Sequence, residues 1–71
     1  MLLLTQGGEI VNLDRMAIID TSSLQVFARQ EAHGRGITLG EYDSEERCKK
    51  VVEDIFDCVS WKANTYRVPE V

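Results

Sequence analysis

The sequence predicts a small α+β fold, and three observations support this class. Residues 43–61 have a strong helical period, whereas the chain before them is divided into short apolar runs that end at glycine or serine pairs. The chain has 71 residues, which is the size of one domain, so we expect residues 1–71 to form a single unit. We predict a small antiparallel sheet of about four strands in a meander, with one C-terminal amphipathic helix packed on one face.

The helical segment carries its apolar side chains on one stripe. They are separated by three and one residues in turn, and they are Cys48, Val51, Val52, Ile55, Phe56 and Val59. Asp43 or Ser44 can accept hydrogen bonds from the first free N–H groups, and Asp43 with Glu46 has the spacing of a capping box. The end of the helix is poorly marked and lies between Ser60 and Asn64.

The strands are predicted from apolar runs and from the turns between them. A first hairpin joins residues 2–6 to residues 9–13 through Gly7-Gly8, because glycine adopts positive φ without a steric penalty. Residues 15–21 form a third strand that ends in a polar turn. Residues 37–42 form the last strand, which leads directly into the helix.

Residues 24–32 can be read in two ways. We favour a strand, because Val26-Phe27 has high β-propensity and the following turn suits a hairpin. The alternative is a short helix, since Gln30-Glu31-Ala32 has helical propensity. At the other end of the chain, the segment from Tyr66 alternates and could add briefly to a sheet edge, where Pro69 would stop it.

Charge and cysteine content restrict the partners and the compartment. The formal net charge is −4, which disfavours nucleic acid as a partner because phosphate contacts need a basic face.

The two cysteines, Cys48 and Cys58, cannot form a disulfide with each other. On one helix they lie roughly 15 Å apart along the axis, whereas a disulfide spans at most about 7 Å between Cα atoms. Free thiols fit a reducing cytoplasm. The apolar start Met1–Leu4 is too short for a signal peptide, and no run has the length of a membrane span, so we expect a cytoplasmic protein.

No residue pattern indicates catalysis, a metal or a cofactor. His33 is the only histidine, and it has no evident nucleophile to activate. Cys48 lies in the first turns of the helix, where the dipole lowers a thiol pKa, but it also belongs to the apolar stripe. We therefore interpret it as a small buried hydrophobe. Two cysteines and a distant histidine match no zinc pattern, and we expect a protein that is not an enzyme.

Five residues are candidates for binding a ligand or a partner protein: Arg29, Arg35, Trp61, Tyr66 and Arg67. Gly34-Arg35-Gly36 could present N–H groups and a guanidinium to an anion, although a hairpin turn is the commoner reason for this pattern. Trp61 and Tyr66 near the helix end either cover the core or form an exposed patch for a partner. Leu2-Leu3-Leu4 adds more apolar surface than one small sheet face can cover, which predicts a homo-oligomer.

Four segments resemble a group of short bacterial and phage-encoded proteins. They are Thr5-Gln6, Val11-Asn12-Leu13-Asp14, the stretch from Ile37 to Arg47 that contains Leu-Gly-Glu-Tyr and Glu-Glu-Arg, and Tyr66-Arg67-Val68-Pro69-Glu70. Val68 stands where the group has methionine. The resemblance covers most of the chain and implies a sheet with one helix and an origin in a mobile element. Its motifs look structural, and it implies no functional residue.

These observations predict a small non-enzymatic interaction module, derived from a phage or prophage, that binds or inhibits a host protein as an oligomer. The alternative is an oligomer that sequesters an anionic, nucleotide-like small molecule through Arg29, Arg35 or Arg67. A third hypothesis is single-stranded nucleic-acid binding on the sheet face, with Phe27 and Tyr42 as stacking platforms.

Overall fold

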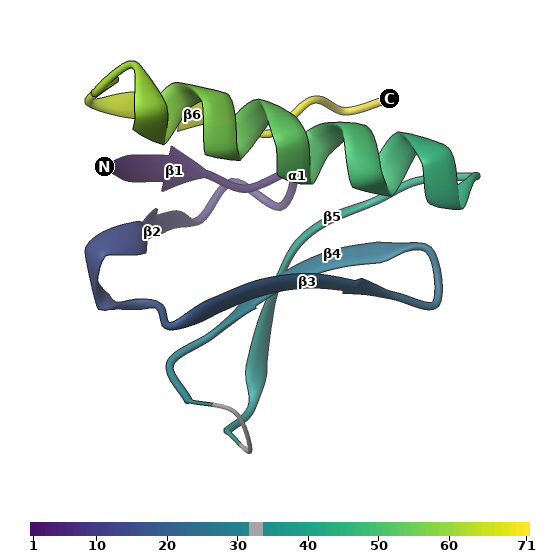
Figure 1. Cartoon of the computed structure of the whole chain (residues 1–71). Coiled ribbons are helices and arrows are strands. Elements are labelled where there is room, and N and C mark those ends of the chain that lie inside the picture. The colour runs from purple at the N-terminus through teal and green to yellow at the C-terminus, as the bar shows by residue number, and fades with distance from the viewer. Residues whose placement is uncertain (32–33) are drawn as a thin grey trace.

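Two small sheets and one helix make up the fold, as Figure 1 shows for the computed structural model. The structure describes residues 1–31 and 34–71. In chain order the elements are β1 (Leu2–Leu4), β2 (Ile10–Asn12), the 3-10 turn η1 (Leu13–Arg15), β3 (Ile18–Ser22), β4 (Gln25–Arg29), β5 (Gly36–Glu41), α1 (Glu45–Ser60) and β6 (Thr65–Arg67). The α+β class is confirmed. The single four-stranded sheet is wrong, because the strands form two sheets, and the helix is not C-terminal, because β6 follows it.

The first sheet has the order β2-β1-β6. β1 pairs antiparallel with β2, with Leu3 opposite Val11, so the first predicted hairpin is confirmed. Its turn contains Gly8 at a φ of +87°, where an L side chain would be strained. The predicted edge strand near Tyr66 also forms, and it pairs in parallel with β1, with Tyr66 opposite Leu3.

The second sheet is the antiparallel meander β3-β4-β5. Residues 25–29 form its central strand, so the strand reading of this segment is confirmed and the helical one is wrong. η1 separates this sheet from the first one. The Asn12 side chain accepts a hydrogen bond from the Asp14 N–H at 3.1 Å, and this local bond turns the chain out of β2. For that reason β3 does not continue the first hairpin as a third paired strand.

The turn between β3 and β4 has an unusual backbone. Ser23 and Leu24 both have positive φ, at +51° and +63°. Two-residue hairpin turns of this type normally contain asparagine and glycine, because the left-handed region costs other residues roughly 1–2 kcal/mol. The structure thus holds Leu24 in a strained and exposed position.

α1 begins one residue later than a capping box at Asp43 would require. Ser44 is the N-cap, and its Oγ accepts the Arg47 N–H at 3.2 Å. The third helical residue is then Arg47 rather than an acid, so the Asp43–Glu46 capping box is wrong. The helix ends at Ser60, within the predicted limits, and Lys62 follows with a φ of +58°.

The core lies between the helix and the inner faces of both sheets. Its most deeply buried side chains are Leu3, Leu39, Val26, Val51 and Cys48. Burial raises the pKa of the Cys48 thiol, and the nearby Glu45 carboxylate raises it further. The interpretation of Cys48 as a buried hydrophobe is confirmed, and both cysteines are free thiols. In the described part of the chain, α1 lacks the length and apolar character needed to cross a membrane.

Candidate functional site

The first hairpin, the end of β5 and the C-terminal tail meet around one side chain, Gln6. Its Nε2 donates to the carbonyl oxygens of Glu41, Pro69 and Glu70 at 3.2, 2.7 and 3.1 Å. Its Oε1 accepts the Glu41 N–H at 2.8 Å. One amide therefore joins the first hairpin to β5 and to the C-terminal tail, so its contacts are with the chain's own backbone rather than with a ligand.

Gly40 and Tyr42 complete this cluster. A Cβ atom on Gly40 would lie 3.0 Å from Gln6 Cδ and 3.0 Å from Val68 Cγ1, so any other residue there would force these side chains to shift. The Tyr42 hydroxyl donates to the Pro69 carbonyl oxygen at 2.6 Å, and burial raises the pKa of this buried phenol. Tyr42 as an exposed stacking platform is therefore wrong, and the motif residues hold the tail in place.

The structure does not bring the predicted arginines together. Arg29 on β4 lies 5.1 Å from the centre of the Phe27 ring and 3.7 Å from Asp20. The connection between β4 and β5, which contains the exposed Arg35, lies at the bottom of Figure 1, whereas β6, which contains Arg67, lies near the top. His33 lies outside the described residues. Within one chain, Arg29, Arg35 and Arg67 therefore do not converge on one site.

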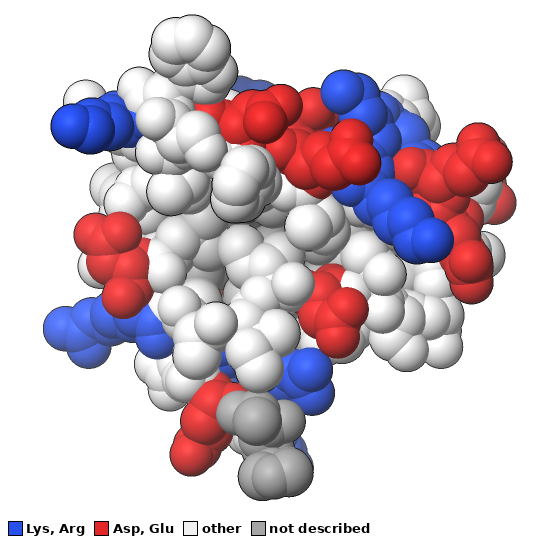
Figure 2. All heavy atoms as spheres, viewed as in Figure 1, with Lys and Arg blue, Asp and Glu red and all other residues white. Residues whose placement is uncertain are grey.

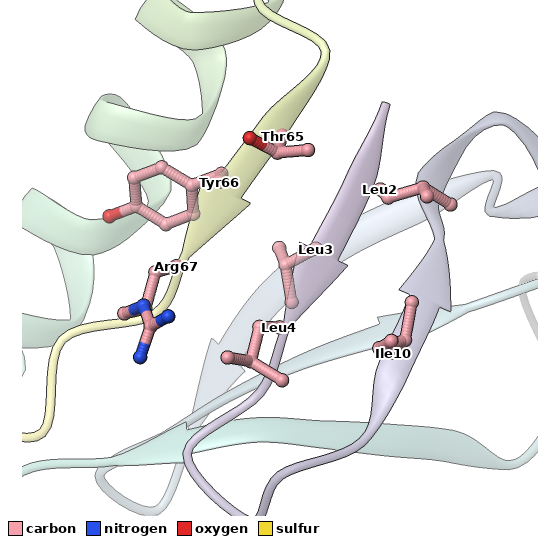
Figure 3. A pocket seen from close by; sticks show the side chains of 7 residues that line it. All are labelled: Leu2, Leu3, Leu4, Ile10, Thr65, Tyr66 and Arg67. Atoms are coloured by element: carbon pink, nitrogen blue, oxygen red, sulfur yellow. The ribbon is translucent and has the colours of Figure 1, made fainter.

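The two predicted aromatic residues have different surroundings. The Tyr66 ring lies between β6 and α1 (Figure 3), where burial raises its pKa to about 12, and the Asp54 carboxylate adds to the shift. Within the described residues its buried hydroxyl has no hydrogen-bond partner. Trp61 follows the helix and is 84% exposed. Tyr66 therefore covers the core, whereas Trp61 is available to a partner.

Arg67 borders a shallow hollow of about 320 Å³ on the outer face of the first sheet (Figure 3). The strand register places Ile10, Leu4 and Arg67 in one row across the three strands. Leu2 is also exposed and Ile10 is 72% exposed, whereas Leu3 points into the core. The predicted surplus of apolar surface is therefore present, and it has one guanidinium at its edge.

The larger candidate site lies between the helix and the edge strand β3, and we name it the α1–β3 groove. It consists of two adjoining hollows of about 310 and 350 Å³ that share Ile19 and Val52. The first hollow is apolar and is lined by Leu13, Met16, Ala17, Ile18, Ile19, Val52, Ile55, Phe56 and Val59. The second also includes charged residues and is lined by Ile19, Asp20, Thr21, Lys49, Val52 and Glu53.

Large apolar side chains of the groove remain in contact with solvent. Phe56 is 70% exposed and Val59 is 54% exposed, although both belong to the predicted apolar stripe. Figure 2 shows the result as a broad uncharged area on this face, with acidic side chains above it on the helix side. The apolar stripe of α1 is wider than the area that the β3-β4-β5 sheet covers. Only Cys48, Val51 and Ile55 of the stripe are buried.

Sequence reasoning missed this groove, although a signal for it was present. The six apolar positions form one wide stripe, and a small sheet can cover part of such a stripe and leave the rest at the surface. Val52, Phe56 and Val59 form a second row beside the buried one, with the spacing i, i+4, i+7. Such a row predicts a second contact surface on the helix.

The described residues contain no group of three or more histidine, cysteine, aspartate or glutamate side chains that could hold a metal ion. Comparisons with known protein families, with curated proteins and with solved structures found no match for this chain.

Proposed function

We propose that the chain is a non-enzymatic protein-interaction module and that the α1–β3 groove is its binding surface. The observation that supports this proposal most directly is the exposure of Phe56 and Val59 beside a preformed hollow. Full burial of a side chain such as phenylalanine or valine contributes about 1.5–3 kcal/mol. Because Phe56 and Val59 stay largely exposed in the fold, most of this free energy remains available for binding a partner. Contiguous exposed apolar surface with a polar border is typical of protein-binding sites.

The resemblance to short phage-encoded proteins supports a host protein as the partner. A standard interface buries about 800 Å² on each partner, which one face of a chain of 71 residues can supply. On this proposal the chain acts by occupying a functional surface of the host protein. Trp61, next to the end of the groove-forming helix, would extend the contact, because tryptophan is enriched among residues that dominate binding energy.

Site-specific photo-crosslinking tests the proposal. Phe56 is replaced by p-benzoylphenylalanine, and the full chain is irradiated in the cells that express it. We expect one discrete covalent adduct with another protein. The matched control carries the same photoreactive residue at Leu24, which is exposed at the opposite end of β3 and outside the groove. Equal labelling from both positions, or none from position 56, would refute the groove as the binding surface.

The sequestering function remains the second candidate, and Arg67 is the observation that favours it. Its guanidinium borders the apolar hollow on the first sheet, and within residues 1–31 and 34–71 it forms no ion pair. An aromatic base on Leu2 and Ile10 with a phosphate on Arg67 would suit this surface. Ligand at 100 times its Kd stabilises a protein by about 2.7 kcal/mol. A nucleotide that raises Tm for the native chain but not for Arg67→Gln would establish this function.

A further inference from the structure

We propose that the occupant of the α1–β3 groove is a basic amphipathic α-helix of another protein. This inference rests on the proposed function and adds the chemistry and the secondary structure of the partner.

The charge around the groove favours a basic partner. Asp20 and Glu53 line its second hollow together with a single cation, Lys49. Asp57 follows one turn after Glu53 on α1. In the described part of the chain, neither Glu53 nor Asp57 has an ion pair, whereas Asp20 lies 3.7 Å from Arg29 and Asp54 is paired with Lys50 at 3.1 Å. Lysine or arginine residues that flank an apolar stripe would meet these carboxylates.

The edge of β3 disfavours an extended partner. Adding a strand to a sheet requires the free N–H and C=O groups of the edge strand. The Thr21 N–H is already bonded to the Asp20 Oδ1 at 2.7 Å. A charged side chain that covers its own strand edge is a known protection against pairing with another strand. This bond occupies one donor of the β3 edge, so a ladder for an added strand is interrupted at Thr21, whereas side chains line the whole groove.

A second copy of the chain fits the groove poorly. Two copies that bring Val52, Phe56 and Val59 together about a two-fold axis place their α1 helices either antiparallel or parallel. In the antiparallel arrangement Glu53 of each copy lies on the side of Asp57 of the other, and in the parallel arrangement each carboxylate lies on the side of its own counterpart. In both arrangements acidic side chains of the two copies approach each other, and Lys49 is the one cation among the residues that line each groove. A partner with the opposite charge has no such penalty.

The length of the groove matches about three helical turns. Lys49 to Val59 spans ten residues, or about 15 Å along the axis of α1. A helix of this length presents apolar side chains at i, i+4 and i+7 to the hollow lined by Met16, Ile18 and Phe56. Its basic residues, on the solvent side of that stripe, would reach Glu53 and Asp20.

Three synthetic peptides test this inference with the full chain. All three carry leucine at i, i+4 and i+7 within about three turns. The first has lysines beside the stripe, the second has glutamates at the same positions, and the third is the lysine peptide with a central proline that prevents a helix. Fluorescence anisotropy of the labelled peptides gives each Kd. We expect the lysine peptide to bind at least tenfold more tightly than the other two.

Charge reversal in the protein provides the control. Glu53→Lys should reduce the preference for the lysine peptide at least tenfold, whereas Glu9→Lys, an equal charge change at an exposed residue outside the groove, should leave it unchanged. Equal effects of the two variants would show attraction to net charge only and overturn the inference. Equal binding of the proline peptide would exclude a helical partner.

The two proposals can fail separately. If position 56 crosslinks to a protein but no lysine peptide binds, the basic helix is wrong and the binding surface stands. If the crosslinked adduct has twice the mass of the chain, the occupant is a second copy and the inference is overturned. If position 56 gives no adduct, the proposed function itself is refuted.

Discussion

Replacing Gln6 with methionine should destabilise the protein by about 2–3 kcal/mol. Methionine has a similar length but removes every side-chain hydrogen bond that joins the first hairpin, β5 and the tail. Each of the two shortest bonds, to Pro69 and from Glu41, contributes about 0.5–1.5 kcal/mol, and an unpaired N–H adds a desolvation cost. A protein of this size has a total stability of about 4–10 kcal/mol, so the loss is a large fraction of it.

Urea denaturation followed by circular dichroism measures this effect, and a thermal scan should show Tm lowered by about 8–20 °C. The matched control is Gln25→Met. Gln25 also contacts Glu41, but through a single exposed bond from its Nε2 to the carboxylate at 3.1 Å, so we expect a loss below about 0.5 kcal/mol. If both variants lose the same stability, the role assigned to Gln6 is wrong.

The variant Gln6→Glu adds a pH dependence to this prediction. A carboxylate in place of the amide would face three carbonyl oxygens, which disfavours its charged form and raises its pKa in the folded state. A raised pKa means that stability is highest below the unfolded value of about 4.3 and falls as the pH rises through the folded value. We therefore expect Gln6→Glu to be more stable at pH 4 than at pH 7 relative to the native chain. No change between these pH values would contradict this expectation.

Three further predictions concern single residues. The folded-state pKa of Tyr66 is about 12, above the usual value of about 10 for tyrosine. The free energy of unfolding should therefore fall as the pH rises from about 10 to about 12. In urea titrations at a series of pH values, Tyr66→Phe should reduce this fall. In the native state, Cys58 should react with a thiol reagent much faster than the buried Cys48, as mass spectrometry of the alkylated chain would show. Leu24→Gly should stabilise the protein by about 1 kcal/mol, measured by urea denaturation, because it relieves a left-handed backbone at an exposed turn.

The sequence by itself determined the elements whose cause is local. The helix predicted over residues 43–61 is α1, because its period and its capping residues lie within one segment. The first hairpin follows from Gly7-Gly8, since the turn fixes which residues face each other. The choice of strand for residues 25–29 was also correct, because β-propensity and an adjacent turn are both short-range signals.

Only the tertiary structure decided how these elements combine. The parallel pairing of β1 with β6 joins the two ends of the described chain, and no local pattern specifies such a pairing. On the other side of β1, η1 turns the chain out of β2, so β3 starts a separate sheet. The division into two sheets then determines which apolar row of α1 is buried. Val51 and Ile55 face the core, whereas Phe56 is left at the surface, where the candidate binding groove lies.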